Sequence, residues 1–546
     1  MRHFALLLDR LILTPQRNGK LRLLRDYFSN TPDPERGFAL AAITGELDIP
    51  SAKPAMLREL IQARMDPELF ALSYDYVGDL AETIALAWPE QPSEVKLNSE
   101  LHLSDVVNTL LQTAKRETPA LVESWLDRLD SSGRYALIKL LTGGLRVGVS
   151  GRLAKTALAQ LGDRDADEIE EIWHGLEPPY ETLFAWVEGI GSIPTNTNPA
   201  PFRPAMLAHP IDDVDFDKLD PADFSAEFKW DGIRVQAASG TDADGVVRKG
   251  LYSRTGEDIA RAFPDLLENI DFNAAIDGEL LVLIEGRVQP FNVLQQRLNR
   301  KTVSAKMMQK YPAYIRAYDI LALGSEDLRA LPFSQRRAQL EALLGQHQLD
   351  RIDVSPLVHF DTWEAAAAAR KQPGLHGAAE DADAVEGLMF KRWDSSYVPG
   401  RPRGLWFKWK RDPFIIDAVL MYAQRGHGKR SSFYSDYTFG VWRGSEIVPV
   451  GKAYFGFTDD ELKQIDRFVR NNTTNRFGPV REVTHDGENG LVLEVAFEGL
   501  NRSTRHKSGV AMRFPRISRL RWDKPTREAD NIETLEALLP REDSVQ

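Results

Sequence analysis

Hydrophobic side chains recur every three or four positions through about the first 190 residues, which is the spacing of amphipathic helices. The stretches Leu101 to Leu111 and Leu121 to Leu141 show this period clearly. The apolar side chains of residues 1–13 follow it too, and Arg10 interrupts them, so we predict an amphipathic helix there and not a signal peptide. The pattern as a whole predicts an all-α N-terminal domain.

A segment rich in Gly, Pro, Asn and Thr, from Gly189 to Pro201, is typical of a linker. From Phe224 onward the pattern changes to short strand-like runs with turn residues between them. The predicted strands are Ala226 to Ala237, Leu251 to Arg254, Ile276 to Ile284 and Tyr314 to Leu323. Helical stretches interleave with them at Phe333 to Leu344 and Trp363 to Arg370. This mixture predicts an α+β domain.

After Pro413 the chain again alternates as short strands do. We predict these strands at Ile415 to Met421, Phe433 to Trp442, Ile447 to Lys452 and Leu491 to Phe497. One helical segment, Asp459 to Asn471, interrupts them. About 130 residues of this kind suit a small β-barrel such as an OB-fold. The fold class is therefore multidomain, with an all-α, an α+β and a C-terminal β-barrel part.

Composition narrows the class of protein further. A chain of 546 residues suggests three or four domains at roughly 150 residues each. Because there is no cysteine, disulfides, thiolate zinc sites, iron–sulfur clusters and a cysteine nucleophile are excluded. No apolar run approaches the roughly 18 residues that a membrane helix needs, so we expect no membrane partner and a cytoplasmic location.

The net charge of -12 argues mildly against a polyanionic partner, but charge is strongly segregated along the chain. Seven basic residues and no acid lie between Asn501 and Trp522. Seven basic residues against one acid lie between Lys391 and Arg411. A single basic run could equally well be a solvated surface or a binding surface. Here there are two runs, and both contain interleaved aromatic residues. Together they favour a surface that binds phosphate or nucleic acid.

The segment from Glu227 to Arg234 reads EFKWDGIR, with Lys229 between apolar neighbours on a predicted strand. An isolated lysine of this kind could simply lie at a strand edge and extend to water. The alternative is a nucleophile whose pKa is lowered by burial and by nearby cations, so that a neutral amine is present near pH 7. Asp231 and Gly232 would form the tight turn that exposes it, and Arg234 is placed to hold a phosphate.

Further motifs follow in a fixed order. They are Ser253 to Glu257, Ile276 to Leu280, Tyr318-Asp319, Val385 to Lys391, Trp406 to Lys410 and Arg513 to Ile517. In this order and spacing the set resembles the nucleotidyltransferase motifs of ATP-dependent DNA ligases, whose superfamily also contains RNA ligases and mRNA capping enzymes. Flanking segments extend the resemblance over nearly the whole chain. They are Leu141 to Gly148, Arg203 to Pro210 and Glu494 to Gly499.

The resemblance implies three domains. They are a helical DNA-binding domain (1–200), an adenylation or nucleotidyltransferase domain (201–412) and an OB-fold domain (413–546). The layout is similar to bacterial and archaeal ligases of compact length. It implies a monomer that encircles nicked duplex DNA in the cytosol or nucleoid. Such an enzyme seals 5′-phosphate/3′-hydroxyl nicks in repair, recombination or replication, through AMP carried on a lysine. ATP would be the AMP donor, with Mg²⁺ or Mn²⁺.

The residues that match the motifs imply individual roles. Lys229 would carry AMP, Glu227 would accept a hydrogen bond from the adenine amino group, and Tyr318 would stack on the base. Glu279 and Glu386 would contact the ribose or hold the metal ion. The implied nucleotide and phosphate contacts are Arg234, Arg254, Lys391, Lys408, Lys410, Arg513 and Arg516. The implied DNA backbone contacts are Arg146 and Arg152.

One position departs from the family pattern. Ligases often carry an arginine six residues before the first lysine of the Trp406 to Lys410 motif, and this chain has Pro402 there. Either Arg401 or Arg403 could take its place. The family's OB domain also swings, first bringing Arg513 and Arg516 to the ATP β- and γ-phosphates and then withdrawing.

Three alternatives are open from the sequence. An NAD-dependent ligase shares the lysine chemistry but resembles a chain with a four-cysteine zinc module, which this chain lacks. An RNA ligase or capping enzyme would not explain Leu141 to Gly148. A DNA-end-binding scaffold without activity would be expected to lose Lys229, Glu386 or the motif lysines, and all are present.

Overall fold

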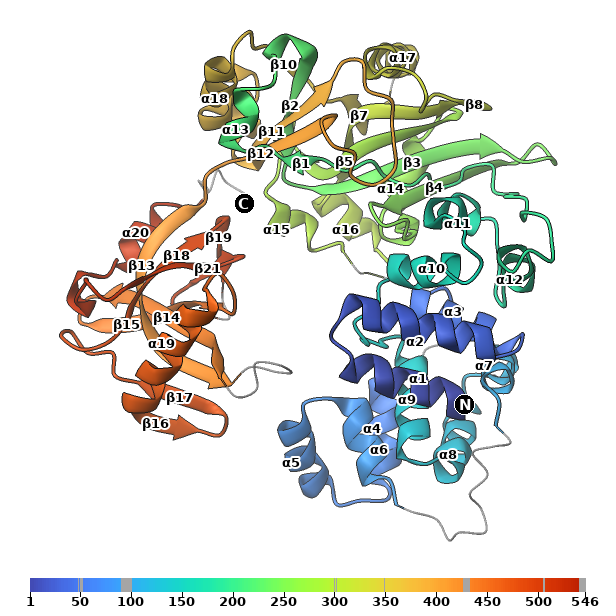
Figure 1. Cartoon of the computed structure of the whole chain (residues 1–546), viewed down its shortest axis with the longest axis horizontal. Helices are drawn as coiled ribbons and strands as arrows, with labels where there is room; N and C mark the ends of the chain where they lie inside the picture. The colour runs from blue at the N-terminus through green and yellow to red at the C-terminus, as the bar shows by residue number, and fades with distance from the viewer. Residues whose placement is uncertain are drawn as a thin grey trace.

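The fold comes from a computed structural model of the chain, described over residues 1–47, 49, 53–89, 101–298, 300, 302–347, 349–425, 433–503 and 506–539. Figure 1 shows three bodies in an open arc: a helical region, a central domain and a strand-rich C-terminal domain. The central domain joins the other two. No helix in these described ranges is long and apolar enough to cross a membrane.

The helical region confirms the all-α prediction for the N-terminal part. Its helices are α1 (Arg2–Leu13), α2 (Arg17–Asn30), α3 (Glu35–Thr44), α4 (Pro54–Gln62), α5 (Pro67–Val77), α6 (Leu80–Ala87), α7 (Leu103–Gln112), α8 (Thr118–Arg128), α9 (Ser131–Thr142), α10 (Gly151–Ala159), α11 (Ala166–Trp173) and α12 (Glu181–Val187). Their apolar faces form one buried cluster. Short polar side chains begin several helices, for example Asp130 at α9 and Ser150 at α10.

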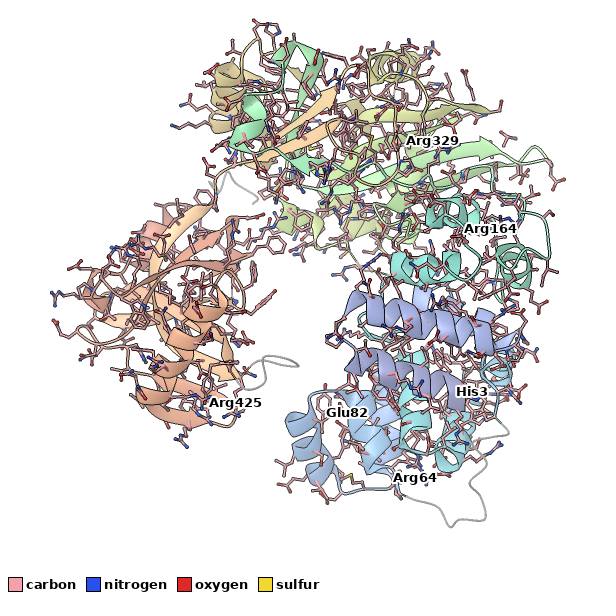
Figure 2. The ribbon with its side chains drawn as sticks, viewed as in Figure 1. His3, Arg64, Glu82, Arg164, Arg329 and Arg425 are labelled. Atoms are coloured by element: carbon pink, nitrogen blue, oxygen red, sulfur yellow. The ribbon has the colours of Figure 1, made fainter. Side chains whose placement is uncertain are left out.

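The helical region rests on the central domain near the end of α11. The ring of His174 lies 4.6 Å from that of Tyr252, between ring centroids. Arg329 of the central domain forms an ion pair with Glu171, and Figure 2 labels Arg329 at this junction. These contacts join parts of the chain that lie 78 or more residues apart in sequence. They hold the helical region at a defined place beside the central sheets.

The central domain contains two sheets. The larger has the order β4 (Val247–Ser253), β3 (Ile233–Thr241), β5 (Ala274–Ile284), β7 (Ala313–Leu323), β8 (Glu326–Asp327), with β6 (Arg287–Val288) on β5 and β9 (Ile352–Val354) on β7. The smaller has the order β1 (His209–Pro210), β12 (Trp406–Lys410), β11 (Val385–Arg392), β2 (Phe224–Trp230), β10 (Leu357–Val358). The helices are α13 (Asp213–Phe216), α14 (Pro264–Asn269), α15 (Phe291–Leu294), α16 (Ala305–Lys310), α17 (Phe333–Gln346) and α18 (Trp363–Lys371). The α+β prediction is confirmed.

The prediction of one strand from Ala226 to Ala237 is wrong. The chain ends β2 at Trp230, turns at Asp231 and Gly232, and starts β3 in the other sheet. Alternation of apolar residues continues across the turn, so the pattern alone could not show the change of sheet. This turn is the point where the two sheets of the central domain meet.

Buried ion pairs lie in the core of the central domain. Arg336 donates to Asp319 at 2.8 Å, and both side chains are fully buried. Arg297, also fully buried, pairs with Asp265 at 2.5 Å. Removing one partner of such a pair leaves a charge without compensation and costs about 3–5 kcal/mol. These pairs therefore fix the positions of α17 and α14 beneath the sheets.

The C-terminal domain is rich in strands, as predicted. Its main sheet has the order β15 (Glu446–Ala453), β14 (Tyr434–Arg443), β13 (Phe414–Arg425), β17 (Val480–Val483), β16 (Thr473–Phe477), and β18 (Val492–Phe497) pairs with β13 and β21 (Arg516–Arg521). A hairpin of β19 (Gly499–Arg502) and β20 (Val510–Arg513) lies beside it, with α19 (Asp459–Asn471) and α20 (Ile532–Glu536). The helix predicted at Asp459 to Asn471 is confirmed. The sequence patterns missed β16, β17, β19, β20 and β21. Strand β16 is largely exposed, and β21 is rich in arginine.

Candidate active site

A cavity of about 500 Å³ lies between the two central sheets and the C-terminal domain. Most of the predicted site residues line it. They are Glu227, Lys229, Arg234, Arg254, Glu279, Tyr318, Glu386, Lys391, Arg401, Lys408, Lys410 and Arg513. Arg403 and Arg516 do not line it, and Arg146 and Arg152 belong to the helical region. Segments spread over nearly 300 residues thus converge on one cavity.

The register of the smaller sheet explains why the lysines converge. Lys229 on β2 pairs with Gly387 on β11, and Gly387 pairs with Lys410 on β12. Paired residues on neighbouring strands point to the same face of a sheet. The register shifts between Val385 and Gly387, and this irregularity brings Glu386 to the same face. The two lysines and the carboxylate therefore meet in one row.

Two glycines allow the close approach of the backbone in this row. A Cβ at Gly387 would lie 2.2 Å from the carbonyl oxygen of Trp409, and its φ of +149° is unfavourable for other residues. A Cβ at Gly232 would lie 2.4 Å from the carbonyl oxygen of Leu280. Gly232 thus brings the turn after Lys229 directly against β5.

Lys229 forms an ion pair with Glu386. Burial lowers the pKa of the lysine, but the carboxylates of Glu386, Glu279 and Asp231 raise it more, so its pKa lies above the ordinary value. The expectation that burial and nearby cations lower this pKa is therefore wrong for the nucleotide-free protein. The charges with the largest effect on this amine are those of acids. Compensation of the charge on these acids would lower the pKa of Lys229 and favour its neutral amine.

Lys408 and Lys410 lie two residues apart on β12 and differ in their partners. Lys410 donates to Glu498 at 2.9 Å and lies 3.6 Å from Glu386. Lys408 has no carboxylate within ion-pair distance in the described part of the chain. Its pKa is lowered by burial and by neighbouring cations, the first of which is Arg401. A half-buried lysine among cations is a position that an anion such as a phosphate would stabilise.

The structure distinguishes the two candidate arginines near Pro402. Arg401 lines the cavity and lowers the pKa of Lys408. Arg403 is exposed and does not line it. The geometry therefore favours Arg401. Arg254 is exposed at the cavity after β4, and no ion pair holds it within the described residues.

Glu279 on β5 lines the cavity together with Lys229, and the two side chains influence each other's pKa. Burial raises its pKa to about 7, Lys229 opposes this shift, and Glu386 adds to it. The described residues contain no group of three His, Asp or Glu side chains that could hold a metal ion alone. Mg²⁺ commonly uses only one or two carboxylates and takes its other ligands from phosphate and water. Glu279 and Glu386 fit that donor set.

A pH dependence follows for the nucleotide-free protein. The folded carboxyl of Glu279 keeps its proton up to about pH 7, whereas its ordinary pKa is 4.5. Folding stability should therefore fall as pH rises through this interval. We expect Glu279→Gln to gain roughly 1–3 kcal/mol over the wild type between pH 5 and pH 8. Denaturant unfolding at both pH values measures this, with the exposed Glu268→Gln as control. If the free energy of unfolding depended on pH in the same way for Glu279→Gln and wild type, this would contradict the raised pKa of Glu279.

The residues predicted to bind adenine, Glu227 and Tyr318, lie at a cluster of buried charged side chains. Glu227 is only 2% exposed and accepts from Arg337 at 2.8 Å and from Lys391 at 2.9 Å. The Lys391 ammonium lies 4.3 Å from the centroid of the Tyr318 ring. Lys391 therefore pairs with Glu227 and lies over the Tyr318 ring. This placement differs from the predicted contact with a phosphate. The sequence pattern did not indicate Arg337, which reaches the site from α17.

Arg234 is held from three sides. It donates to Asp277 at 2.5 Å and to the Tyr397 hydroxyl at 2.9 Å, and it also reaches the Met206 carbonyl. Burial alone would lower its pKa, but Asp277 raises it well above the ordinary value. Arg234 is thus a fixed cation in the wall of the cavity.

The C-terminal domain contributes its own residues to the cavity. Arg513 forms an ion pair with Asp231, and its guanidinium lies 4.6 Å from the centroid of the Phe291 ring. Arg516 lies 3.6 Å from Glu498, and Glu498 lines the cavity. The C-terminal domain therefore faces the lysines of the central domain in this structure.

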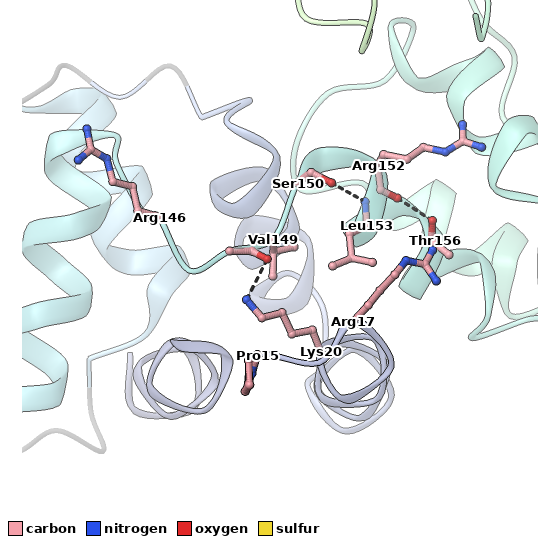
Figure 3. Close-up of a pocket in the computed structure, with 10 residues that line it drawn as sticks. Pro15, Arg17, Lys20, Arg146, Val149, Ser150, Arg152, Leu153 and Thr156 are labelled. Carbon is pink, nitrogen blue, oxygen red and sulfur yellow. Dashed lines mark hydrogen bonds between the residues drawn. The ribbon is translucent and has the colours of Figure 1, made fainter. Parts of the chain in front are cut away.

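A second cavity, of about 620 Å³, lies on the helical region at the start of α10. Figure 3 shows Arg17, Lys20, Arg146 and Arg152 around it. The Lys20 ammonium donates to the carbonyl oxygens of Val147 and Gly148, while Arg152 pairs with acids of α11. Its basic lining suits a polyanion.

Of the basic run between Asn501 and Trp522 in the C-terminal domain, Arg505 lies outside the described residues.

Comparison with known proteins gives consistent matches along the chain. Residues 205–410 match the family described as "ATP dependent DNA ligase domain", residues 430–524 the "ATP dependent DNA ligase C terminal region", and residues 1–159 the "DNA ligase N terminus".

Individual relatives agree. The chain is 32% identical to a "Probable DNA ligase" of Koribacter versatilis, over 85% of this chain and 82% of that one. It is 30% identical to a "DNA ligase" of Thermococcus onnurineus, over 84% and 82%. A solved structure named "Pmar-Lig_PreS3" covers 95% of this chain and 99% of its own, with a TM-score of 0.55 at 15% identity. That structure is similar in fold.

Proposed function

The chain belongs to the ATP-dependent DNA ligase family, and we propose that it seals 5′-phosphate/3′-hydroxyl nicks in duplex DNA through AMP carried on Lys229. The family membership makes it a DNA ligase that uses ATP. The observation that carries the finer proposal is the row of Lys229, Glu386 and Lys410. Beside it lies Lys408, which has no carboxylate at ion-pair distance among the described residues. A nucleophile, acids for a metal ion and cations for a phosphate thus occupy one cavity.

We propose that the reaction takes three steps, which this arrangement supports. The Lys229 amine attacks the α-phosphorus of ATP, a P–N bond forms, and the bond to pyrophosphate breaks. A 5′-phosphate oxygen of the nick then attacks the same phosphorus, and the lysine amine leaves as it takes up a proton. Finally the 3′-hydroxyl attacks the 5′-phosphate, and AMP leaves. Lys408 and Lys410 would neutralise charge that builds on the α-phosphate during the first two steps.

Deprotonation of Lys229 is the requirement for the first step. In the nucleotide-free protein Glu386 and Glu279 raise the pKa of Lys229. Compensating their charge lowers that pKa, and a divalent cation bound at these carboxylates with ATP would supply the compensation. We therefore assign Glu279 and Glu386 to the metal ion, Mg²⁺ or Mn²⁺. Tyr318 and Glu227 are assigned to adenine, and Arg234, Arg254 and Arg401 to the ribose and phosphates.

Incubation with labelled ATP or labelled NAD and Mg²⁺, followed by a denaturing gel, tests the nucleotide. We expect a covalent adduct from ATP and none from NAD. Joining of a nicked duplex that carries a 5′-phosphate tests the substrate, and a nick without that phosphate is the control. Transfer of label from NAD, or joining without the 5′-phosphate, would contradict the proposal.

We further propose that residues 1–200 bind the duplex backbone, with Arg146 and Arg152 among the contacts, and that residues 201–412 and 413–546 form the adenylation and OB-fold domains. The protein would act as a monomer around nicked DNA in replication, repair or recombination. The basic cavity at the start of α10 supports the DNA assignment. Arg146 is the stronger candidate, because both guanidinium ends of Arg152 already contact acids.

Salt dependence tests the assignment of Arg146. Each phosphate contact releases condensed counterions, so the logarithm of nick affinity should fall with the logarithm of salt by roughly 0.9 per contact. Arg146→Ala should make that slope shallower by roughly one and weaken all sequences alike. Self-adenylation should stay unchanged. Arg116→Ala, an exposed arginine outside the cavity, is the control. A wild-type slope near zero would rule out the backbone assignment.

A further inference from the structure

Glu498 lies where the C-terminal domain meets the nucleotide cavity. It stands between β18 and β19, and its side chain is partly buried. One carboxylate oxygen accepts from Lys410 of the central domain at 2.9 Å, and the other lies 3.6 Å from Arg516 of its own domain. The acid therefore bridges a lysine of one domain and an arginine of the other. It belongs to the flanking segment Glu494 to Gly499, for which the resemblance implied no individual role.

The Lys410 ammonium has two acidic neighbours. Glu498 is the nearer, and Glu386 lies at 3.6 Å. Glu386 also pairs with Lys229, so the ammonium groups of Lys229 and Lys410 approach one carboxylate. A phosphate attached to the Lys229 nitrogen would consequently lie within reach of Lys410. Such a phosphate competes directly with Glu498, because both are anions that need the same ammonium.

The contact between the domains has few other charged supports. Among the described residues, the ion pair of Arg513 with Asp231 is the other one that links the C-terminal domain to the central domain. Both pairs use cations, Lys410 and Arg513, that the family resemblance assigns to phosphates of the nucleotide. In the absence of nucleotide, the two acids thus occupy places that phosphates would take. An ion pair at a partly exposed site contributes little, so its loss can shift a domain equilibrium without unfolding the protein.

We propose that Glu498 is a positioning residue that holds the C-terminal domain over the cavity through Lys410, and that a phosphate on Lys229 releases it by taking Lys410. This couples the state of the nucleophile to the position of the C-terminal domain. The release of the C-terminal domain by a phosphate on Lys229 rests on the proposed function. The contact that holds this domain concerns the nucleotide-free protein alone. The experiment therefore separates the two.

Energy transfer between two dyes measures the domain distance. The chain has no cysteine, so Asp361→Cys in the central domain and Asp460→Cys on α19 give unique labels at highly exposed positions. In nucleotide-free protein, Glu498→Gln should lower the ratio of closed to open molecules by about two- to fivefold. Added salt should open the wild type and leave the variant nearly unchanged. Glu498→Asp should retain part of the closure.

Controls separate this role from a general loss of structure. Glu488→Gln removes an exposed acid of the same domain that pairs with Arg527, and should leave the transfer unchanged. Circular dichroism of Glu498→Gln should match the wild type. Adenylated wild type should resemble nucleotide-free Glu498→Gln.

Two results would overturn the proposal. One is equal transfer and equal salt response of wild type and Glu498→Gln without nucleotide. The other is a normal AMP adduct on wild type that leaves the transfer unchanged. Failure to form any adduct would instead count against the proposed role of Lys229. The salt comparison would still test the contact of Glu498 with Lys410, because it uses no nucleotide.

Discussion

Lys229→Ala should carry no AMP after incubation with ATP and Mg²⁺, and should not seal a nick when the reaction starts from ATP. The amine is the nucleophile of the proposed first step, and alanine has no group that can form the P–N bond. The same variant should still seal a nick that already carries AMP on its 5′-phosphate, because the last step uses the 3′-hydroxyl. A denaturing gel with labelled ATP and a joining assay on both substrates measure these outcomes.

A matched lysine serves as the control for this result. Lys249 lies on β4, outside the cavity, and its ammonium donates to the Leu267 carbonyl. Lys249→Ala should keep both the adduct and the sealing. A stable AMP adduct on Lys229→Ala would move the nucleophile elsewhere. Loss of sealing on the pre-adenylated nick as well would show that the lysine has a role in the last step.

Removal of residues 1–200 should separate nucleotide chemistry from nick binding. The cavity that contains Lys229 is lined by residues from 207 onward, so self-adenylation should continue at a similar rate. Affinity for a nicked duplex should fall at least about tenfold, since the basic cavity at α10 is lost and tenfold corresponds to only 1.4 kcal/mol. Electrophoretic mobility shift and adduct formation measure the two quantities.

The truncated protein exposes surface that the helical region now covers. Tyr252 loses the packing of His174, and Arg329 loses Glu171. Circular dichroism must therefore show that the remaining domains are folded. His174→Ala in the full chain is the matched comparison for the lost packing, and it should retain nick binding. Rapid sealing of dilute nicks by the truncated protein would contradict the domain assignment.

Sequence patterns predicted long amphipathic elements best. The helix at Asp459 to Asn471 combines a capping Thr458 with a strongly one-sided apolar face, and its predicted bounds agree with the structure. The tight turn at Asp231 and Gly232 was predicted, but the change of sheet there was missed, because strand periodicity continues through the turn. Strand β21 was missed because arginines occupy half of its six positions.

Much of the candidate site could be placed from motifs, but its electrostatics could not. The pKa of Lys229 depends on which acids the irregularity of β11 brings to its face, and nothing in the sequence indicates that irregularity. Tyr318 lies at a similar register shift, between β5 and β7. Arg337 comes from a helix without a recognised motif, and Glu498 lies in a flanking segment for which the resemblance implied no individual role. Their roles follow from contacts across the fold.

The buried ion pairs of the central domain have a consequence for heat resistance. Hydration of charged groups becomes less favourable as temperature rises, so the cost of keeping Asp319 and Arg336 away from water falls on warming. The helical region contains partly buried ion pairs of its own, such as Lys139 with Asp79, so this effect is not confined to the central domain. We expect the pair of Asp319 and Arg336 to keep α17 in place against the central sheet as the temperature rises.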